Sequence, residues 1–554
     1  MAKKAKKPSP KKRQPRTEFW KKGERKLWTV AIYMAADGRS GSSDLDQVAI
    51  RELGSIVEAA RTQSNVNVAV QLDLHGVAGS LRLLAGPEPK VQGKFGPELN
   101  AAKKDTLRNF LKWVTTYSES EHYLLLFWGH SSGPVVFVGD FELARPGSPN
   151  GPLASSGASA DVLSVISALL KGPQPDASDA SRPALVKTVG AALKDQSTLF
   201  AQAKYQSKRG RAKTPVVDIV LFKECFMSTL ETAFELDHAR FMIASQGKVP
   251  RLNWPYKEIF RCLAENKEPE SAADWILDAL GAHYEIGRNR RGKDHVPVAL
   301  VDIPRARALA ERYVPKLVTG LEAARRDPDR RKKIASAFNR SALGDPALVD
   351  VKLLCRNLAA LEGVPYQRVR AAAAGLLELF SGAPGGKDGP AAVRLARGDS
   401  MFGGVSVLFF PDPIDALGPA HVGGSFIAPV VARHPERYET LDFAEKTRWK
   451  EIALERLAGW RVNILESFRG GQRLDFNQLE EISKAIALGD ILGRPTDLDI
   501  DKPFDLDKGF DFNKGFDFNK GFDFSKGFDF SKGFDFAKGF DFVKAFDFGA
   551  DPSS

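Results

Sequence analysis

Seven short apolar segments constrain the fold of this 554-residue chain more than any other feature. Most are continuous apolar runs, which is typical of strands buried on both faces of a parallel sheet. Helical patterns, such as those at 44–62 and 106–117, lie between them. The segments are 27–36, 66–74, 122–129, 216–222, 240–245, 296–303 and 404–410. This order predicts an α/β fold, a three-layer α/β/α sandwich with a mostly parallel sheet.

The net charge of +11 lies mainly at one end of the chain. Residues 1–27 hold 12 Lys and Arg and 2 acidic residues, whereas 498–554 holds 8 Lys and 12 Asp. The 470 residues between them carry only about +5. A Lys- and Pro-rich arm cannot bury a core, so we expect 1–27 to be disordered. It is interpreted either as a solubilising arm or as a weak anchor for nucleic acid or an acidic surface.

Three scattered cysteines are too few for a disulfide framework and lack the spacing of a CxxC metal site. No apolar run reaches the roughly 20 residues needed to span a bilayer. No apolar segment follows the basic N-terminus, as it would in a secretory signal. We therefore expect a cytoplasmic protein with reduced cysteines and no membrane partner.

Residues that can act as a base or a nucleophile follow two of the apolar segments. His130 comes after 122–129, and Cys225 comes after 216–222. Active sites lie at the carboxyl ends of parallel strands, where a histidine and a cysteine form a base and nucleophile pair. Ser228 and Glu231 have capping-box spacing, so a helix start near Cys225 is expected to favour its thiolate. The alternative is that Cys225 is a small core residue, as expected for Cys262 and Cys355.

Six segments in order resemble the clostripain family of cysteine peptidases, in the caspase-like clan. The resemblance covers roughly 28–457. The segments are WTVAIYMAAD (28–37), HYLLLFWGHSSG (122–133), VVDIVLFKECFMSTLETAFEL (216–236), MIASQGKVPRLNWPY (242–256), GGVSVLFFPDP (403–413) and RYETLDFAEKTRWKEIALERL (437–457). The resemblance implies a cysteine endopeptidase with a caspase-like fold and protein substrates, and the composition adds the expectation that it is intracellular.

By this resemblance His130 is the general base and Cys225 is the nucleophile that forms a thioester acyl-enzyme. The backbone N–H groups of Ser131 and Cys225 would form the oxyanion hole. The family usually has glycine after its histidine, where this chain has Ser131. No cofactor or metal site is expected, although some family members depend on calcium.

Composition, repeats and the resemblance together suggest how the chain is divided. The expected parts are a basic arm (1–27), a caspase-like catalytic domain with a long insertion loop at 141–214 (28–265), the C-terminal part of the peptidase unit with helices and strand 404–410 (266–457), a helical connector (458–497) and a repeat tail (498–554). Helices are expected at 162–170 and 183–195 inside the loop, and over much of 304–400 and 437–490.

The predicted substrate-binding residues are Lys223, Ser245 and Arg251. Family members that cleave after Arg or Lys have aspartate two residues before the cysteine, where this chain has Lys223 followed by Glu224. A buried lysine would repel a basic substrate side chain. The hypothesis is a pocket that rejects basic residues and prefers acidic ones, with Lys223 as the counter-ion. The alternatives are a solvent-facing Lys223 with a neutral preference, or the family's basic preference.

The insertion loop 141–214 lies between His130 and Cys225, and relatives in this clan are often activated by cleavage there. Segment 207–213, SKRGRAK, suits a trypsin-like activating protease. The predicted enzyme is therefore a latent zymogen. Two other classes remain open, namely a pseudoprotease scaffold and a nucleic-acid-associated protein that works through 1–27.

The tail repeats the unit Lys-Gly-Phe-Asp-Phe-x from Lys508 onward, with seven Phe-Asp-Phe triplets. It holds 15 of the 36 phenylalanines, all at even-numbered positions, so an extended chain would line them along one face. The repeats are interpreted as docking elements for a partner, as a self-association or strand-addition segment, or as an inhibitor of the catalytic groove. The alternative is a low-complexity tail without a role.

Overall fold

The computed structural model describes the central part of the chain with several gaps. The described residues are 26–36, 45–74, 80–86, 90–94, 101–131, 133–135, 186–203, 216–250, 253–291, 296–342, 347–381, 391–396, 402–410, 431 and 435–455. The arm at 1–25, the helix expected at 162–170, segment 207–213 and everything after 455 lie outside the described residues.

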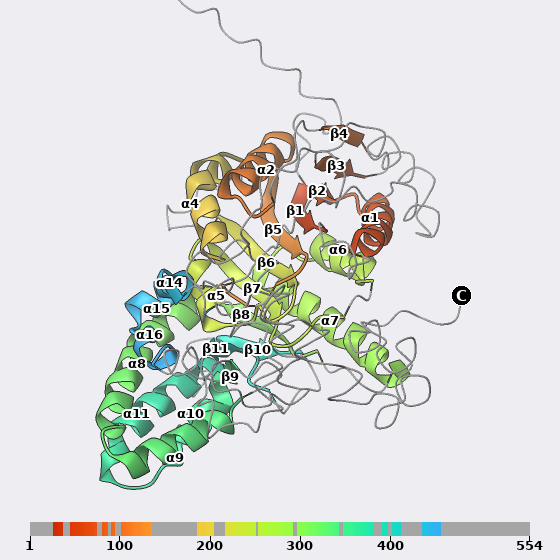
Figure 1. The fold of residues 1–554 in the computed structure, drawn as a ribbon. Helices are drawn as coiled ribbons and strands as arrows, with labels where there is room; N and C mark the ends of the chain where they lie inside the picture. The colour runs from red at the N-terminus through yellow and green to blue at the C-terminus, as the bar shows by residue number, and fades with distance from the viewer. Residues whose placement is uncertain are drawn as a thin grey trace, which may run out of the picture.

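A nine-stranded sheet runs through the molecule (Figure 1) in the order β10-β8-β7-β6-β5-β1-β2-β3-β4. Its strands are β1 (Lys26–Ala35), β2 (Val66–Asp73), β3 (Leu81–Ala85), β4 (Lys90–Lys94), β5 (Ser120–Trp128), β6 (Val217–Lys223), β7 (Ala239–Ser245), β8 (Val298–Asp302) and β10 (Val393–Leu395). The five central strands, β7, β6, β5, β1 and β2, are mutually parallel. The strands outside them pair antiparallel.

The predicted α/β class is confirmed, with two corrections to the sheet. The segment expected at 296–303 forms β8, which runs antiparallel to β7. The segment expected at 404–410 leaves the main sheet, because β11 (Ser406–Leu408) pairs with β9 (Leu348–Asp350) in a separate two-stranded sheet. The strands β3, β4, β9 and β10 were not predicted.

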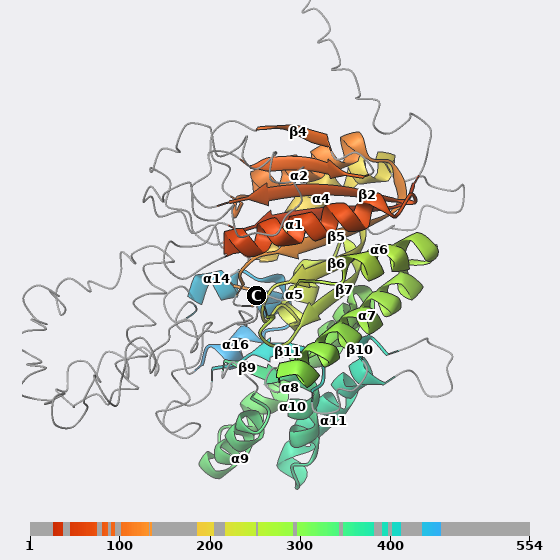
Figure 2. The same cartoon turned by 90° about the vertical axis from the view of Figure 1, so that its right-hand side faces the viewer.

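Helices cover both faces of the sheet, which gives the expected three layers (Figure 2). Side chains of α1 (Leu45–Arg61), α6 (Tyr256–Glu265) and α7 (Pro269–Arg291) form one core with the first face. Side chains of α2 (Lys104–Tyr117), α4 (Val186–Ala203), α5 (Leu230–Glu235) and α8 (Ile303–Ala324) form a second core with the other face. Both faces of the central strands are therefore buried, as their continuous apolar sequences require.

A helical part extends from the sheet beyond β8 (Figure 1). It contains α8, α9 (Pro328–Asn339), α10 (Val351–Ala359), the 3-10 turn η1 (Val364–Tyr366), α11 (Gln367–Leu376) and the 3-10 turn η2 (Leu377–Phe380). Short helices at α14 (Pro435–Glu439), α15 (Asp442–Lys446) and α16 (Lys450–Ala453) pack near α5 and α8. The helix expected at 183–195 is α4. No helix in the described ranges is both long and apolar enough to cross a membrane.

Candidate functional site

The two candidate catalytic residues follow neighbouring strands that end level with each other. Trp128, the last residue of β5, is the register partner of Lys223, the last residue of β6. His130 and Cys225 each lie two residues farther along. The Ser131 hydroxyl donates a hydrogen bond to the Cys225 carbonyl oxygen, which joins the two segments directly. The structure therefore brings the two loops together at the carboxyl edge of the sheet.

The segment around Cys225 is held against the chain that leaves β7. Cys225 is half-buried, and its Sγ accepts a hydrogen bond from the Val249 N–H at 3.3 Å. The next residue, Phe226, has a φ of 58° and donates its N–H to the Gly247 carbonyl at 3.0 Å. A bulky residue adopts this left-handed conformation only when its surroundings enforce it, so the cysteine loop is tightly specified.

The thiol of Cys225 is not poised as a thiolate, contrary to expectation. Burial raises its pKa, and Glu224 adds to the rise, while the Val249 hydrogen bond and the charge of Lys248 oppose it. The nearest helix, α5, begins five residues later and is capped by Thr229, whose hydroxyl accepts the Thr232 N–H. The capping box predicted from Ser228 was therefore wrong, and burial outweighs the helix terminus at the sulfur.

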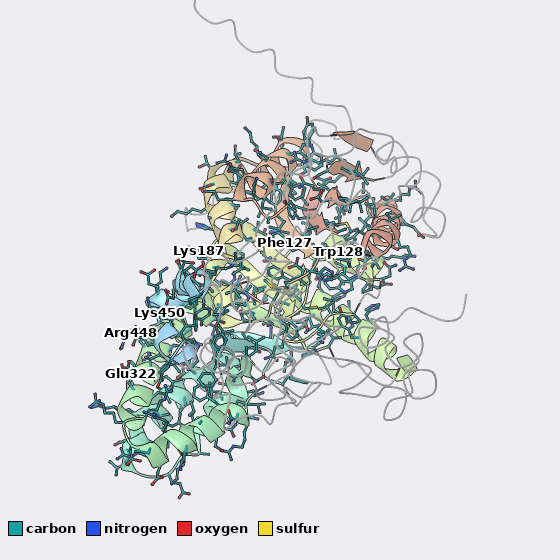
Figure 3. The ribbon with its side chains drawn as sticks, in the orientation of Figure 1. Phe127, Trp128, Lys187, Glu322, Arg448 and Lys450 are labelled. Carbon is teal, nitrogen blue, oxygen red and sulfur yellow. The ribbon has the colours of Figure 1, made fainter. Side chains whose placement is uncertain are left out.

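The loop that carries His130 turns in a confined space after β5 (Trp128 is labelled in Figure 3). A Cβ placed on Gly129 would lie 2.9 Å from the Ala35 carbonyl oxygen, so only glycine lets the chain pass the end of β1 here. His130 itself is half-buried. Because His130 directly follows this glycine, the same confined turn fixes its backbone position.

Lys223 is buried and charge-paired, so the alternative of a solvent-facing side chain was wrong. It is only 6% exposed and forms an ion pair with Glu52 of α1. Its ammonium group lies 5.6 Å from the centre of the Trp254 ring and 5.9 Å from that of Trp128. Burial lowers its pKa well below the usual lysine value.

Glu52 connects Trp128 and Lys223, the residues two positions before His130 and Cys225. Its role was not predicted from the sequence. One carboxylate oxygen pairs with Lys223, and the other accepts hydrogen bonds from the Trp128 indole N–H at 3.0 Å and from the Tyr256 hydroxyl. A signal was present in the sequence. Val48, Glu52 and Ile56 follow i, i+4 spacing, so this carboxylate falls within the apolar stripe of its helix.

Glu224 is a second buried acid beside the cysteine. It is 1% exposed, and neither carboxylate oxygen has a hydrogen-bond partner among the described residues. Burial raises the pKa of this carboxyl well above the usual value. One of its oxygens would lie 3.3 Å from a Cβ at Gly129, so the side chain reaches toward the loop of His130. A neutral carboxylic acid suits this enclosed place better than a carboxylate.

The other predicted substrate-binding residues have different positions. Ser245 is buried, accepts the Gly247 N–H on its hydroxyl at 3.0 Å and accepts the Ser228 N–H on its carbonyl at 2.9 Å. It therefore supports the cysteine loop. Arg251 lies outside the described residues. Within the described ranges, no group of three or more His, Cys, Asp and Glu side chains could hold a metal ion.

Cys262 and Cys355 are buried core residues in α6 and α10, as predicted. Only Cys225 among the three is partly accessible at a strand end. Together with the neighbouring histidine segment, this geometry suits a thiol nucleophile with an adjacent base.

A family comparison agrees with the sequence resemblance over part of the chain. The sequence profile described as the Clostripain family matches residues 207–339, which include Cys225. No curated protein matches the chain. A secreted C11 cysteine protease from Bacteroides thetaiotaomicron, solved with an irreversible peptide inhibitor, has 14% identity over 76% of this chain and 99% of that chain, with a TM-score of 0.46. An inactive zymogen C11 protease from Parabacteroides distasonis has 14% identity over the same shares, with a TM-score of 0.45.

Proposed function

We propose that the chain is a cysteine peptidase of the clostripain family, whose profile matches residues 207–339. It cleaves proteins after a non-basic residue, with Cys225 as nucleophile and His130 as general base. The observation that carries the assignment is that β5 and β6 end side by side, with Trp128 opposite Lys223. His130 and Cys225 each follow this residue pair by two positions. The Ser131 hydroxyl bond to the Cys225 carbonyl supports the same arrangement.

The raised pKa of Cys225 determines how the proposed reaction starts. Because the thiol keeps its proton at neutral pH, His130 removes that proton as the sulfur attacks the scissile carbonyl carbon. A carbon–sulfur bond forms, and the carbonyl oxygen takes up negative charge that the Ser131 and Cys225 N–H groups would stabilise. The imidazolium of His130 then protonates the leaving amine. Water hydrolyses the thioester with His130 again acting as the base.

The proposed specificity follows from the charged side chains of Lys223 and Glu52 near the cysteine. A basic substrate side chain bound beside Cys225 would meet the charge of Lys223, at the position where other family members have an aspartate. An acidic side chain would find the charge of Lys223 already compensated by Glu52. Trp128 and Trp254 supply an apolar, aromatic wall beside this neutral pair. The arrangement favours an uncharged residue before the scissile bond over the acidic residue expected from sequence.

A peptide-library cleavage profile, with the Cys225→Ala variant as control, tests this specificity. We expect enrichment of uncharged residues before the cleaved bond, and no cleavage by the variant. Enrichment of Arg or Lys would refute the proposal, and enrichment of Asp or Glu would show that Lys223 acts as a counter-ion despite Glu52.

We also propose that the enzyme is latent until the chain is cut between α4 and β6, within 207–213. Both elements flanking this segment are packed in the same core, since α4 contributes Val189 and Phe200 and β6 contributes Val220. A cut between them can therefore leave the fold intact. Intact mass analysis of the wild type and Cys225→Ala distinguishes self-cleavage, which only the wild type would show, from cleavage by another protease.

A further inference from the structure

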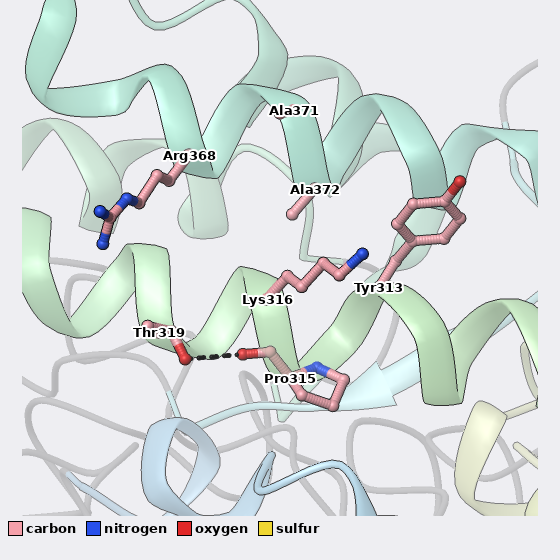
Figure 4. Close-up of a pocket in the computed structure, with 7 residues that line it drawn as sticks. All are labelled: Tyr313, Pro315, Lys316, Thr319, Arg368, Ala371 and Ala372. Atoms are coloured by element: carbon pink, nitrogen blue, oxygen red, sulfur yellow. Dashed lines mark hydrogen bonds between the residues drawn. The ribbon is translucent and has the colours of Figure 1, made fainter.

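A groove lies on the helical part, between α8 and α11 (Figure 4). It has a volume of about 490 Å³ and is largely apolar. The lining residues are Tyr313, Pro315, Lys316, Thr319, Arg368, Ala371 and Ala372. The two helices approach closely at one end of it, where a Cβ on Gly320 would lie 3.1 Å from the Val369 nitrogen. Small residues on α11 leave the floor open beside the Tyr313 ring.

The groove combines an aromatic surface with positive charge. The Lys316 ammonium lies 5.4 Å from the centre of the Tyr313 ring, and the Arg312 guanidinium lies 5.1 Å from it. Lys316 and Arg368 are exposed, and neither has a carboxylate partner among the described residues. Residues 303–380 hold 15 Lys and Arg against 8 Asp and Glu, which makes this part more basic than the rest of the body. Its ligand should be apolar, aromatic and acidic.

We propose that this groove binds the Phe-Asp-Phe repeats of the chain's own C-terminal segment. Each repeat offers two phenylalanines that share one face when the chain is extended, with the aspartate on the other side. The two rings meet the apolar floor and Tyr313, and the carboxylate is left to meet Lys316 or Arg368 at the rim. The segment 498–554 carries four more negative than positive charges, opposite in sign to the helical part.

The path of the chain brings the repeats to the groove. The last described residue, Glu455, forms an ion pair with Arg325 at the end of α8. Arg325 follows the groove residue Thr319 by six positions, or about 9 Å along a helix. Arg448 also donates to the Thr319 hydroxyl at 3.4 Å. The chain therefore leaves the described structure beside the groove.

The intervening length suits binding within one molecule. Lys508, where the regular repeats begin, is 53 residues beyond Glu455. A random coil of that length would have an end-to-end distance of about 40 Å, well beyond the roughly 9 Å that separate Arg325 from Thr319 along the helix, so the connection is long enough for the repeats to reach the groove. Seven copies of the triplet compete for one groove. Weak individual contacts are therefore sufficient for continuous occupancy.

Photo-crosslinking in the full chain tests this proposal. The probe p-benzoylphenylalanine replaces Thr319 in the Cys225→Ala background, and crosslinked peptides are identified by mass spectrometry after irradiation. We expect peptides from 508–548, in the monomer band, with a yield independent of protein concentration. The same probe at the exposed Arg356 on α10, outside the groove, is the positional control and should yield about tenfold less.

Charge reversal separates docking from a general effect on folding. Lys316→Glu with Arg368→Glu should lower the crosslink yield about tenfold, whereas Arg356→Glu should not change it. Changing the aspartate of each triplet to lysine should restore the yield in the double variant. Crosslinks to segments other than the repeats, crosslinks found only in dimers, or a yield unaffected by charge reversal would each overturn the proposal.

Discussion

Replacing Glu52 with glutamine removes the anion that compensates Lys223 in the core. Both side chains are almost fully enclosed, at 0% exposure for Glu52 and 6% for Lys223. Removing one partner of a buried ion pair leaves an uncompensated charge and costs about 3–5 kcal/mol of unfolding free energy. The Trp128 indole and the Tyr256 hydroxyl also lose a charged acceptor. We expect Glu52→Gln to lie at the upper end of that range.

The double variant Glu52→Gln, Lys223→Met isolates the effect of the Lys223 charge on stability. Methionine fills much of the space of lysine without a charge, so the double variant should regain most of the stability lost by the single one. Glu58→Gln is the matched control, because Glu58 lies exposed on the same helix and should change stability by less than about 0.5 kcal/mol.

The pH dependence of the Glu52→Gln variant has a definite sign. Its buried Lys223 has a pKa below that of the unfolded chain, since burial already lowers it in the wild type. The folded variant therefore binds fewer protons than the unfolded chain, and its stability rises with pH up to the unfolded pKa. The double variant should lose this dependence.

Urea unfolding followed by circular dichroism, at pH 7 and pH 9.5, provides the measurement. Peptidase assays on the same samples should show a lower kcat for Glu52→Gln, because Glu52 holds the residues two positions before His130 and Cys225. A single variant within about 0.5 kcal/mol of the wild type, or a double variant as unstable as the single one, would refute the reasoning.

Three further predictions concern groups at or near the site. Alkylation of Cys225 by iodoacetamide should have a pH midpoint above that of free cysteine, because burial raises its pKa; a midpoint near pH 6 would show a preformed thiolate. Glu224→Gln should stabilise the fold more at pH 8 than at pH 5, because the folded acid keeps a proton that the unfolded one has lost; equal effects at both pH values would contradict this. Burial raises the pKa of Glu231 to about 7, so wild-type stability should fall between pH 4.5 and 7, and Glu231→Gln should flatten that slope in thermal melts; an unchanged slope would be evidence against the assignment.

The sequence predicted the central architecture because the parallel strands are continuous apolar runs. Strand direction at the edge was harder to predict. Two successive helices, α6 and α7, separate β7 from β8, and the second helix reverses the direction in which the chain re-enters the sheet. The short strands β9 and β10 have three residues each, which is too few for any periodic pattern.

The candidate catalytic residues were readable because they follow strong strand patterns. The burial of Glu52 was readable from its place in an apolar stripe, but its pairing with Lys223 was not, because the two residues lie 171 positions apart. The state of the Cys225 thiol was also misjudged. The proximity of Cys225 to a helix start can be inferred from sequence. The burial that raises the pKa of its thiol depends on how Glu224 and residues 246–249 fold around it.

The identity of the nucleophile determines every step of the proposed reaction. Intact mass analysis after reaction with a peptidyl acyloxymethyl ketone that carries an uncharged residue next to its reactive group tests this directly. We predict one adduct per chain, located on Cys225, absent from Cys225→Ala and formed much more slowly in His130→Ala. An adduct on Cys262 or Cys355, or peptide hydrolysis that persists in Cys225→Ala, would contradict the account.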